Sequence, residues 1–251
     1  MDDEPRSPSL RVRPRDVAPR VLVVGDPNRV GDAAQLLERA EEVGYFREYR
    51  TITGFFIGKR ITISSHGVGA SGANVCFHEL INCGARTIIR AGTCGAMLPG
   101  IQDGDLIIAT GAVREDGTSE HLAPMSYPAI SDLEITNTLL EIVRQEGTAS
   151  PHLGLMLTQA YFYPGMLPSE TDVWLPTGLV AGVEMELATL LVMAGLRKVR
   201  AGGIFTSDGN LTQQADPESY DPHRTVVEQG KAHMLSIALQ ALARLQEEIT
   251  N

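Results

Sequence analysis

The most constraining feature of this sequence is the alternation of short, continuous apolar runs with longer amphipathic segments. The first clear run is VLVV at residues 21–24, and it stops at the sequence Gly25-Asp26-Pro27. A continuous apolar run predicts a strand that is buried on both faces, and glycine with proline predicts a turn. Because strands and helices alternate from end to end, we expect an α/β fold whose layered sheet is covered by helices on both faces.

The same patterns predict the limits of the individual elements. Strands are expected at residues 21–24, 60–65, 87–91, 105–110, 153–158 and 201–206, and helices at residues 30–43, 73–82, 131–145, 184–194 and 224–248. The stretch at residues 209–222 is long, polar and rich in turn formers, which is typical of a lid over a site. No change in composition marks a linker, so residues 9–251 are predicted to form one domain after a disordered tail at residues 1–8.

Composition argues against several classes of protein. The formal net charge is −10, whereas proteins that bind nucleic acids or membrane surfaces are usually basic. The three cysteines form no CxxC pair, and the six histidines show no ligand spacing, so neither a disulfide framework nor a metal site is expected. The N-terminus lacks the apolar core of a secretory signal, and the longest apolar stretch is about half a membrane-spanning helix. These features predict a cytoplasmic protein that binds neither nucleic acid nor membrane.

Two arginines occupy positions that suit an anion site. Arg90 lies inside the apolar run 88–91, where an arginine is rarely buried without a partner. Thr93 follows it near the expected carboxyl end of a strand, which is where α/β sheets bind ligands. These neighbours favour an anion site over an internal ion pair between Arg90 and an acid. Arg29 follows the turn at Gly25 and begins a predicted helix, whose N-terminus attracts anions, although a plain turn with a surface arginine would look the same.

Acidic residues and one glycine-rich turn complete the candidate site. Glu184 and Glu186 flank Met185 at the start of a very apolar segment, so both carboxylates are expected to be buried and to need partners such as sugar hydroxyls. Exposed acids that complement the helix dipole are the simpler alternative. Asp208 follows the last predicted strand, where an ordinary turn aspartate is common. Residues 67–72 (GVGASG) match the dinucleotide fingerprint, but no acid follows about 20 residues later, so a tight turn lining the site is predicted instead.

Taken together and in this order, these motifs resemble the purine nucleoside and uridine phosphorylase family. The most specific segments are VVGDPNRV, FREYR, SSHGVGASG, IIRAGTCGA, VEMELATL and TSDG, and they span nearly the whole chain from about residue 10. AVRED, YFYPGMLPS and VEMELATLLV are most similar to hexameric purine nucleoside phosphorylases of the protozoan type. The resemblance implies a three-layer α/β fold with a central mixed β-sheet flanked by helices. It also implies a homo-oligomer, expected to be a hexamer built as a trimer of dimers, with no cofactor and with inorganic phosphate as co-substrate.

The resemblance further implies a role for each candidate residue. The implied phosphate site comprises Gly25, Arg29, Arg90 and Thr93, together with Arg47 reaching in from a neighbouring subunit. The implied nucleoside site comprises Phe162 stacked on the base, Val183 and Glu184 lining the site, Met185 beneath the sugar, and Glu186 on the ribose 2′- and 3′-hydroxyls. Asp208 would be the general acid for the leaving purine. The implied reaction is the phosphorolysis of purine ribonucleosides such as inosine and guanosine to the free base and ribose 1-phosphate.

Two departures from the family pattern leave questions, and three alternative functions remain. Ser9 stands where many relatives have a histidine that contacts the ribose 5′-hydroxyl, and residues 209–220 lack the arginine that assists the aspartate in bacterial relatives. A uridine phosphorylase is disfavoured by Asp208 and by the absence of glutamine and arginine at residues 165–169. A hydrolytic nucleosidase would not need the three arginines. A non-catalytic nucleoside-binding protein would be expected to lose either the acid or the arginines.

Overall fold

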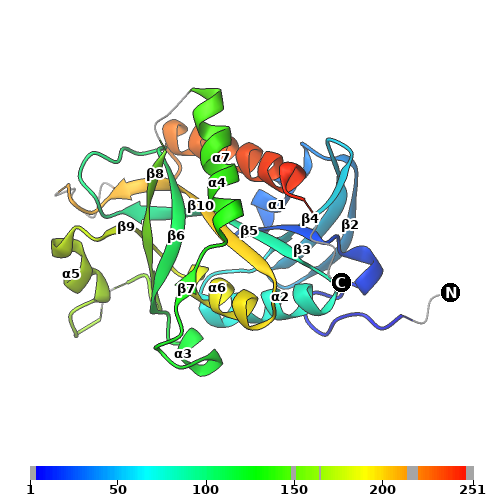
Figure 1. Cartoon of the computed structure of the whole chain (residues 1–251), viewed down its shortest axis with the longest axis horizontal. Helices are drawn as coiled ribbons and strands as arrows, with labels where there is room; N and C mark the ends of the chain where they lie inside the picture. The colour runs from blue at the N-terminus through cyan, green and yellow to red at the C-terminus, as the bar shows by residue number, and fades with distance from the viewer. Residues whose placement is uncertain (1–3, 148–150, 164, 214–219, 247–251) are drawn as a thin grey trace.

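Ten strands form one mixed β-sheet between two layers of helices in the computed structural model, which describes residues 4–147, 151–163, 165–213 and 220–246 (Figure 1). The strands are β1 (Arg20–Val24), β2 (Glu38–Phe46), β3 (Tyr49–Phe56), β4 (Lys59–Ser65), β5 (Thr87–Ala96), β6 (Leu106–Glu115), β7 (Ala129–Ile130), β8 (His152–Gln159), β9 (Val180–Glu184) and β10 (Arg200–Asn210). The helices are α1 (Pro27–Ala34), α2 (Ala70–Asn82), α3 (Ser119–Leu122), α4 (Leu133–Glu146), α5 (Glu170–Trp174), α6 (Leu187–Leu196) and α7 (Thr225–Arg244), with 3-10 turns at Pro14–Asp16 and Leu175–Thr177. The predicted fold class is therefore confirmed.

Strand β5 is the junction of the sheet. On one side it is parallel to β1, which continues through β4, β3 and the edge strand β2. On the other side β5 pairs in parallel with β10, and the end of β5 pairs antiparallel with β9. Because β10 also pairs with β6, and β6 continues through β8 to β9, these five strands close into a ring. The parallel strands β1, β5 and β10 bring their carboxyl-terminal ends to the same region.

Two helical layers bury the two faces of the sheet. Helix α7 packs on β5 and β10 and contacts α4 and α1, so these three helices cover one face. Helices α2 and α6 pack on each other, and α6 also contacts β6 and β10 on the opposite face; Figure 1 shows the two layers above and below the strands. Residues 187–194 of α6 are all buried, as expected for a helix that is apolar all round and enclosed by protein.

Several predicted elements are confirmed, and one predicted helix is largely wrong. The strand at 60–65 and the helices at 73–82 and 131–145 lie where they were expected. The helix predicted at 30–43 ends at Ala34, and the chain then forms β2. The charges at residues 38–42 suggest the exposed face of a helix, but β2 is an edge strand whose residues there are exposed, and pairing with β3 outweighs local helix propensity.

Two limits near the candidate site also differ from prediction. Strand β5 runs on to Ala96 instead of ending at residue 91, so Thr93 and its glycine neighbours lie within the strand and not in a turn. Pairing with β10 continues to Asn210 opposite Ala96 and explains this extension. The helix predicted to start at Glu184 begins at Leu187, because Glu184 ends β9.

Parts of three predictions fall outside the described residues: residues 1–3 of the tail, 214–219 of the lid and 247–248 of the last helix. In the described part of the tail, the Ser7 N–H donates to the Val12 carbonyl at 2.7 Å. Among the described residues, no helix is long and apolar enough to cross a membrane.

Candidate functional site

A cavity of about 1270 Å³ opens where β1, β5, β9 and β10 end, and the segment after β8 forms its outer wall. Every predicted site residue except Arg47 lines this cavity. The predicted residues that line it are Gly25, Arg29, Arg90, Thr93, Phe162, Val183, Glu184, Met185, Glu186 and Asp208. Segments far apart in the sequence therefore meet in one place, as the motif order implied.

Arg29 provides a positive charge in one corner of the cavity, and no described residue forms an ion pair with it. It lies in the first turn of α1, which Asp26 caps by accepting from the Asn28 N–H at 2.8 Å. Burial lowers the pKa of the Arg29 guanidinium, and the nearby charge of Arg90 lowers it further against the pull of Asp26. Arg29 makes no hydrogen bond or ion pair with any other residue that the structure describes. A partly buried cation that forms no ion pair and lies near a second cation is suited to binding an anion, while the charges of Asp26, Glu228 and Asp208 partly offset its own.

Arg90, in contrast, is fully engaged by protein groups. Its side chain is buried, and its Nη2 forms ion pairs with Glu184 at 3.0 Å and with Glu186. Burial lowers the pKa of Arg90, but the carboxylates of Glu186 and Glu184 outweigh this effect and raise it overall. The internal ion pair that the sequence left as an alternative is thus present. An incoming anion can use Arg90 fully only when one of these carboxylates turns away.

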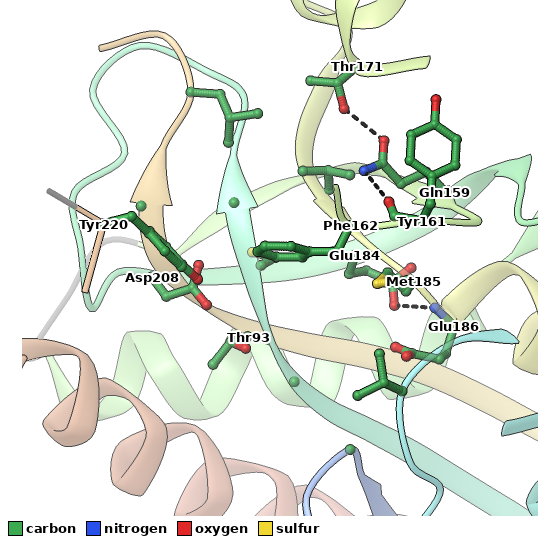
Figure 2. Close-up of a pocket in the computed structure, with 18 of the residues that line it drawn as sticks. Thr93, Gln159, Tyr161, Phe162, Thr171, Glu184, Met185, Glu186, Asp208 and Tyr220 are labelled. Atoms are coloured by element: carbon green, nitrogen blue, oxygen red, sulfur yellow. Dashed lines mark hydrogen bonds between the residues drawn. The ribbon is translucent and has the colours of Figure 1, made fainter. Parts of the chain in front are cut away.

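Glu184 is held too firmly to be that carboxylate. It accepts hydrogen bonds from the Thr158 hydroxyl at 2.6 Å, from the backbone N–H groups of Glu186 and Leu187 at 2.9–3.0 Å, and from Arg90 Nε at 3.0 Å. It therefore closes the junction between β9 and α6 while anchoring Arg90. Figure 2 shows its bond to the Glu186 backbone on the wall of the cavity.

Glu186 is the freer of the two acids. Its Oε1 accepts from the Gly69 N–H at 2.6 Å, and its Oε2 is paired with Arg90. Burial raises the pKa of Glu186, and the charge of Glu184 adds to this effect against the pull of Arg90. Gly69 has φ +92°, a conformation that favours glycine, so the glycine-rich turn serves to aim this N–H at Glu186. Met185 lies beside Glu186 on the cavity wall (Figure 2).

Asp208 lines the same cavity, and a β-bulge aims it there. The pairing of β10 with β5 passes from Ser207 opposite Cys94 directly to Gly209 opposite Gly95, so Asp208 is the extra residue. Bulges of this kind redirect a side chain and are frequent next to active sites. Burial raises the pKa of Asp208, while hydrogen bonds from the Tyr220 and Thr93 hydroxyls partly offset this effect.

Two aromatic side chains flank the space in front of Asp208. Figure 2 shows Phe162 facing Tyr220, which lies directly over Asp208. The two ring centroids are 6.4 Å apart at an angle of 45°, and Phe162 is 58% exposed, so the outer side of this space is open. The segment that carries Phe162 is tied back by Gln159, whose amide donates to the Tyr161 carbonyl at 2.8 Å and accepts from the Thr171 hydroxyl at 2.8 Å.

Sequence reasoning missed four residues of this site. Tyr220 belongs to the stretch interpreted as a lid, and Arg224 lies just beyond it, where it donates to the Asp208 carbonyl at 3.1 Å and pairs with Asp103. Gln159 and His66 carry no spacing signal that distinguishes them from core residues. His66 precedes the glycine-rich turn, and its position next to Arg90 depends on the pairing of distant strands.

Arg47 is the exception among the predicted residues. It lies in the two-residue loop between β2 and β3, is exposed and does not line the cavity of its own chain. Its guanidinium stacks over the Phe46 ring at 5.4 Å, and its φ of +55° is uncommon for a residue other than glycine.

Comparison with known proteins identifies the family. The sequence pattern of the Phosphorylase superfamily matches residues 19–243. The chain belongs to this family. It is 36% identical to the purine nucleoside phosphorylase of Plasmodium vivax over 95% of this chain and 96% of that one. It is also 34% identical to the uridine phosphorylase of Escherichia coli over 89% of this chain and 91% of that one.

Solved structures of phosphorylases agree with this assignment. The purine nucleoside phosphorylase of Toxoplasma gondii in complex with immucillin-H has a TM-score of 0.90, with 33% identity over 97% of both chains. The uridine phosphorylase of Vibrio fischeri has a TM-score of 0.87, with 27% identity over 98% of this chain and all of that one. This phosphorylase therefore acts on nucleosides. Within its described residues, no group of three or more histidines, cysteines or acids is placed to hold a metal ion.

Proposed function

We propose that this enzyme cleaves purine ribonucleosides with inorganic phosphate and releases the free base and ribose 1-phosphate. The observation that carries the proposal is Arg29, which forms no ion pair with a described residue, near Arg90 in the same cavity as a buried acid, Asp208. Thr93, whose hydroxyl bonds to Asp208, and the turn at Gly25 add a hydroxyl and backbone groups to the wall of the same cavity. A phosphate-sized anion would supply the charge that this corner lacks.

The reaction requires one task of the arginines and another of Asp208. A phosphate oxygen forms the bond to ribose C1′ while the bond from C1′ to purine N9 breaks, and the bonding electrons pass to the purine. Phosphate held by the arginines is positioned for attack and stabilises the positive charge that develops on the sugar. A protonated Asp208 donates its proton to purine N7 and neutralises the leaving base. Burial supports this role because it raises the pKa of Asp208 and so favours the protonated form.

Glu186 would connect the two substrates. Its carboxylate is paired with Arg90, and the ribose 2′- and 3′-hydroxyls offer it another set of partners. When Glu186 turns to the ribose, a hydrogen-bonding group of Arg90 becomes available for phosphate. Binding of nucleoside and binding of phosphate should therefore assist each other.

Uridine is the second candidate substrate, because relatives of similar identity include uridine phosphorylases. A purine is favoured because Asp208 can protonate an acceptor such as N7. Residues 165–169 provide neither the glutamine nor the arginine that the uridine branch uses. Gln159 also lines the cavity, but both ends of its amide are already engaged by Tyr161 and Thr171.

A phosphate-dependence assay tests this proposal. Release of base is measured from inosine, guanosine, adenosine, methylthioadenosine and uridine, each with and without inorganic phosphate. We expect rapid release of hypoxanthine and guanine that requires phosphate and yields ribose 1-phosphate. Equal release of hypoxanthine without phosphate would refute phosphorolysis, and a preference for uridine would refute the purine assignment.

Arg47 supports the proposal only if the protein is an oligomer. Since Arg47 is exposed and outside its own cavity, it would complete the phosphate site of a neighbouring copy, and its unusual backbone conformation suits a functional loop. We expect a hexamer in the cytoplasm, where the three buried free cysteines would stay reduced.

Co-expression of Arg47→Ala with Asp208→Asn subunits tests the contact between Arg47 and the neighbouring site. Each variant alone should be nearly inactive, whereas mixed oligomers should regain activity, and failure to regain it would refute action across the interface.

A further inference from the structure

His66 is a buried histidine that none of the roles above uses. It follows β4 directly, is 0% exposed, and its backbone N–H donates to the Val24 carbonyl at 2.9 Å. This bond ties it to the end of β1, just before the turn that carries Arg29. Its ring packs edge-on against Phe77 with the centroids 5.4 Å apart. The imidazole is therefore fixed in place next to Arg90, one of the two arginines proposed to bind phosphate.

The partners of the imidazole determine which nitrogen carries the proton. Arg90 Nη1 lies 2.7 Å from His66 Nε2, and a guanidinium can only donate, so Nε2 must be the acceptor. Nδ1 lies 2.8 Å from the Gly67 carbonyl and carries the hydrogen that this bond requires. Burial holds the pKa of His66 well below its ordinary value, and the positive charges of Arg90 and Arg29 lower it further against the Gly67 carbonyl. His66 is thus a neutral acceptor.

We infer that His66 is a positioning residue that holds the Arg90 guanidinium in the orientation required for phosphate binding. This inference rests on the proposed phosphorolysis, since it gives Arg90 a phosphate to bind. Glu184 fixes Arg90 through Nε and Nη2, and His66 fixes the opposite side through Nη1. When Glu186 turns to the ribose, these two contacts remain and prevent the guanidinium from rotating. The Nη2 hydrogen that Glu186 releases then becomes available for phosphate, together with the second Nη1 hydrogen, which no described residue accepts.

The chemistry of imidazole suits this task better than that of a third acid. A carboxylate at this position would neutralise Arg90 and compete with phosphate for it. A cation would repel Arg90 and Arg29. A neutral ring orients the guanidinium without reducing its charge, which leaves that charge for the substrate.

A matched pair of variants tests the inference. His66→Gln can place an amide oxygen near the position of Nε2, whereas the shorter His66→Asn reaches only the position of Nδ1. Steady-state kinetics with inosine give separate KM values for phosphate and nucleoside, and calorimetry gives nucleoside affinity without phosphate. We expect His66→Asn to raise the phosphate KM about tenfold, the loss typical of one hydrogen bond to a charged group. We expect His66→Gln to remain close to wild type, with nucleoside affinity unchanged in both variants.

Controls separate this inference from a structural role and from the proposed function. His121→Ala removes an exposed histidine and should leave all constants unchanged. If His66→Asn folds and its phosphate KM equals that of the wild type, the inference is refuted. It is equally refuted if Asn and Gln weaken phosphate and nucleoside binding by the same factor, which is the pattern of general damage. If the wild-type enzyme needs no phosphate, the proposed function fails first, and that result is visible before any variant is made.

Discussion

The substitution Asp208→Asn should remove proton donation to the leaving base while phosphate binding is retained. Asparagine keeps the size of the side chain, and its amide oxygen still accepts from the hydroxyls that bond to Asp208, but the amide is far too weak an acid to transfer a proton to the base. General acid catalysis typically contributes about 10²- to 10⁴-fold to the rate, which corresponds to about 3–5 kcal/mol of activation free energy. We therefore expect kcat for inosine to fall by about 10²- to 10⁴-fold, while phosphate affinity is retained because Arg29 and Arg90 are untouched.

The same substitution should leave the fold more stable at neutral pH. Burial raises the pKa of Asp208 above the ordinary value of 3.8, so the ionised carboxylate is disfavoured in the folded state. A group with a raised pKa in the folded state loses its stabilising contribution as the pH rises through that pKa. Asparagine removes this penalty. The Tm of the variant should exceed that of the wild type at pH 8, and the two should converge as the pH falls to about 4, close to the unperturbed pKa of aspartate.

Initial rates of hypoxanthine release at saturating phosphate, together with thermal unfolding at several pH values, measure both effects. The wild-type kcat should fall on the alkaline side as Asp208 loses its proton in the complex, and the residual activity of the variant should lack this fall. Asp221→Asn, at an exposed aspartate near the start of α7, serves as the control. A variant that is stable and turns over inosine as fast as the wild type would remove Asp208 from the chemistry.

Three further predictions concern Arg29 and the residues that contact Asp208 and Arg90. Arg29→Gln should raise the phosphate KM about ten- to a hundredfold and raise Tm in phosphate-free buffer, because an uncompensated charge is removed; an unchanged phosphate KM would contradict the anion site. Tyr220→Phe removes a hydrogen bond that lowers the pKa of Asp208, so the alkaline fall of kcat should move to higher pH, and a move to lower pH would contradict this. Glu184→Gln leaves buried donors of Arg90 and Leu187 poorly matched and should destabilise the fold by about 3 kcal/mol in urea unfolding; an unchanged unfolding midpoint would refute its anchoring role.

The identity of the cavity residues could be predicted from the sequence, but their orientation could not. Gly25, Arg29, Arg90 and Asp208 lie in short motifs whose order along the chain is specific, so they could be named together. The bulge that aims Asp208 depends on the pairing of β10 with β5 and leaves no local signal. Similarly, the extension of β5 past residue 91 is a result of pairing that outweighs local turn propensity.

The errors near β2 and at the start of α6 have related causes. Residues 38–42 favour a helix locally, but the strand β3 provides backbone partners that only tertiary structure reveals. In the sequence, Glu184 resembles an acid in the first turn of a helix. The fold shows instead that Glu184 is the last residue of β9 and that its carboxylate accepts from the N–H groups at the start of α6. Interactions between distant segments, rather than residue type, decide each case.

The ion pair between Arg90 and Glu186 should weaken the binding of simple anions such as chloride to Arg90. A chloride ion that enters alone meets an arginine already satisfied by a carboxylate, which the Gly69 N–H holds from the other side. Chloride can offer Glu186 no compensation for leaving, whereas a nucleoside brings two hydroxyls to receive it. We therefore expect simple anions to compete poorly for Arg90, although Arg29 stays open to them, and we expect phosphate to bind most tightly when a nucleoside is already bound.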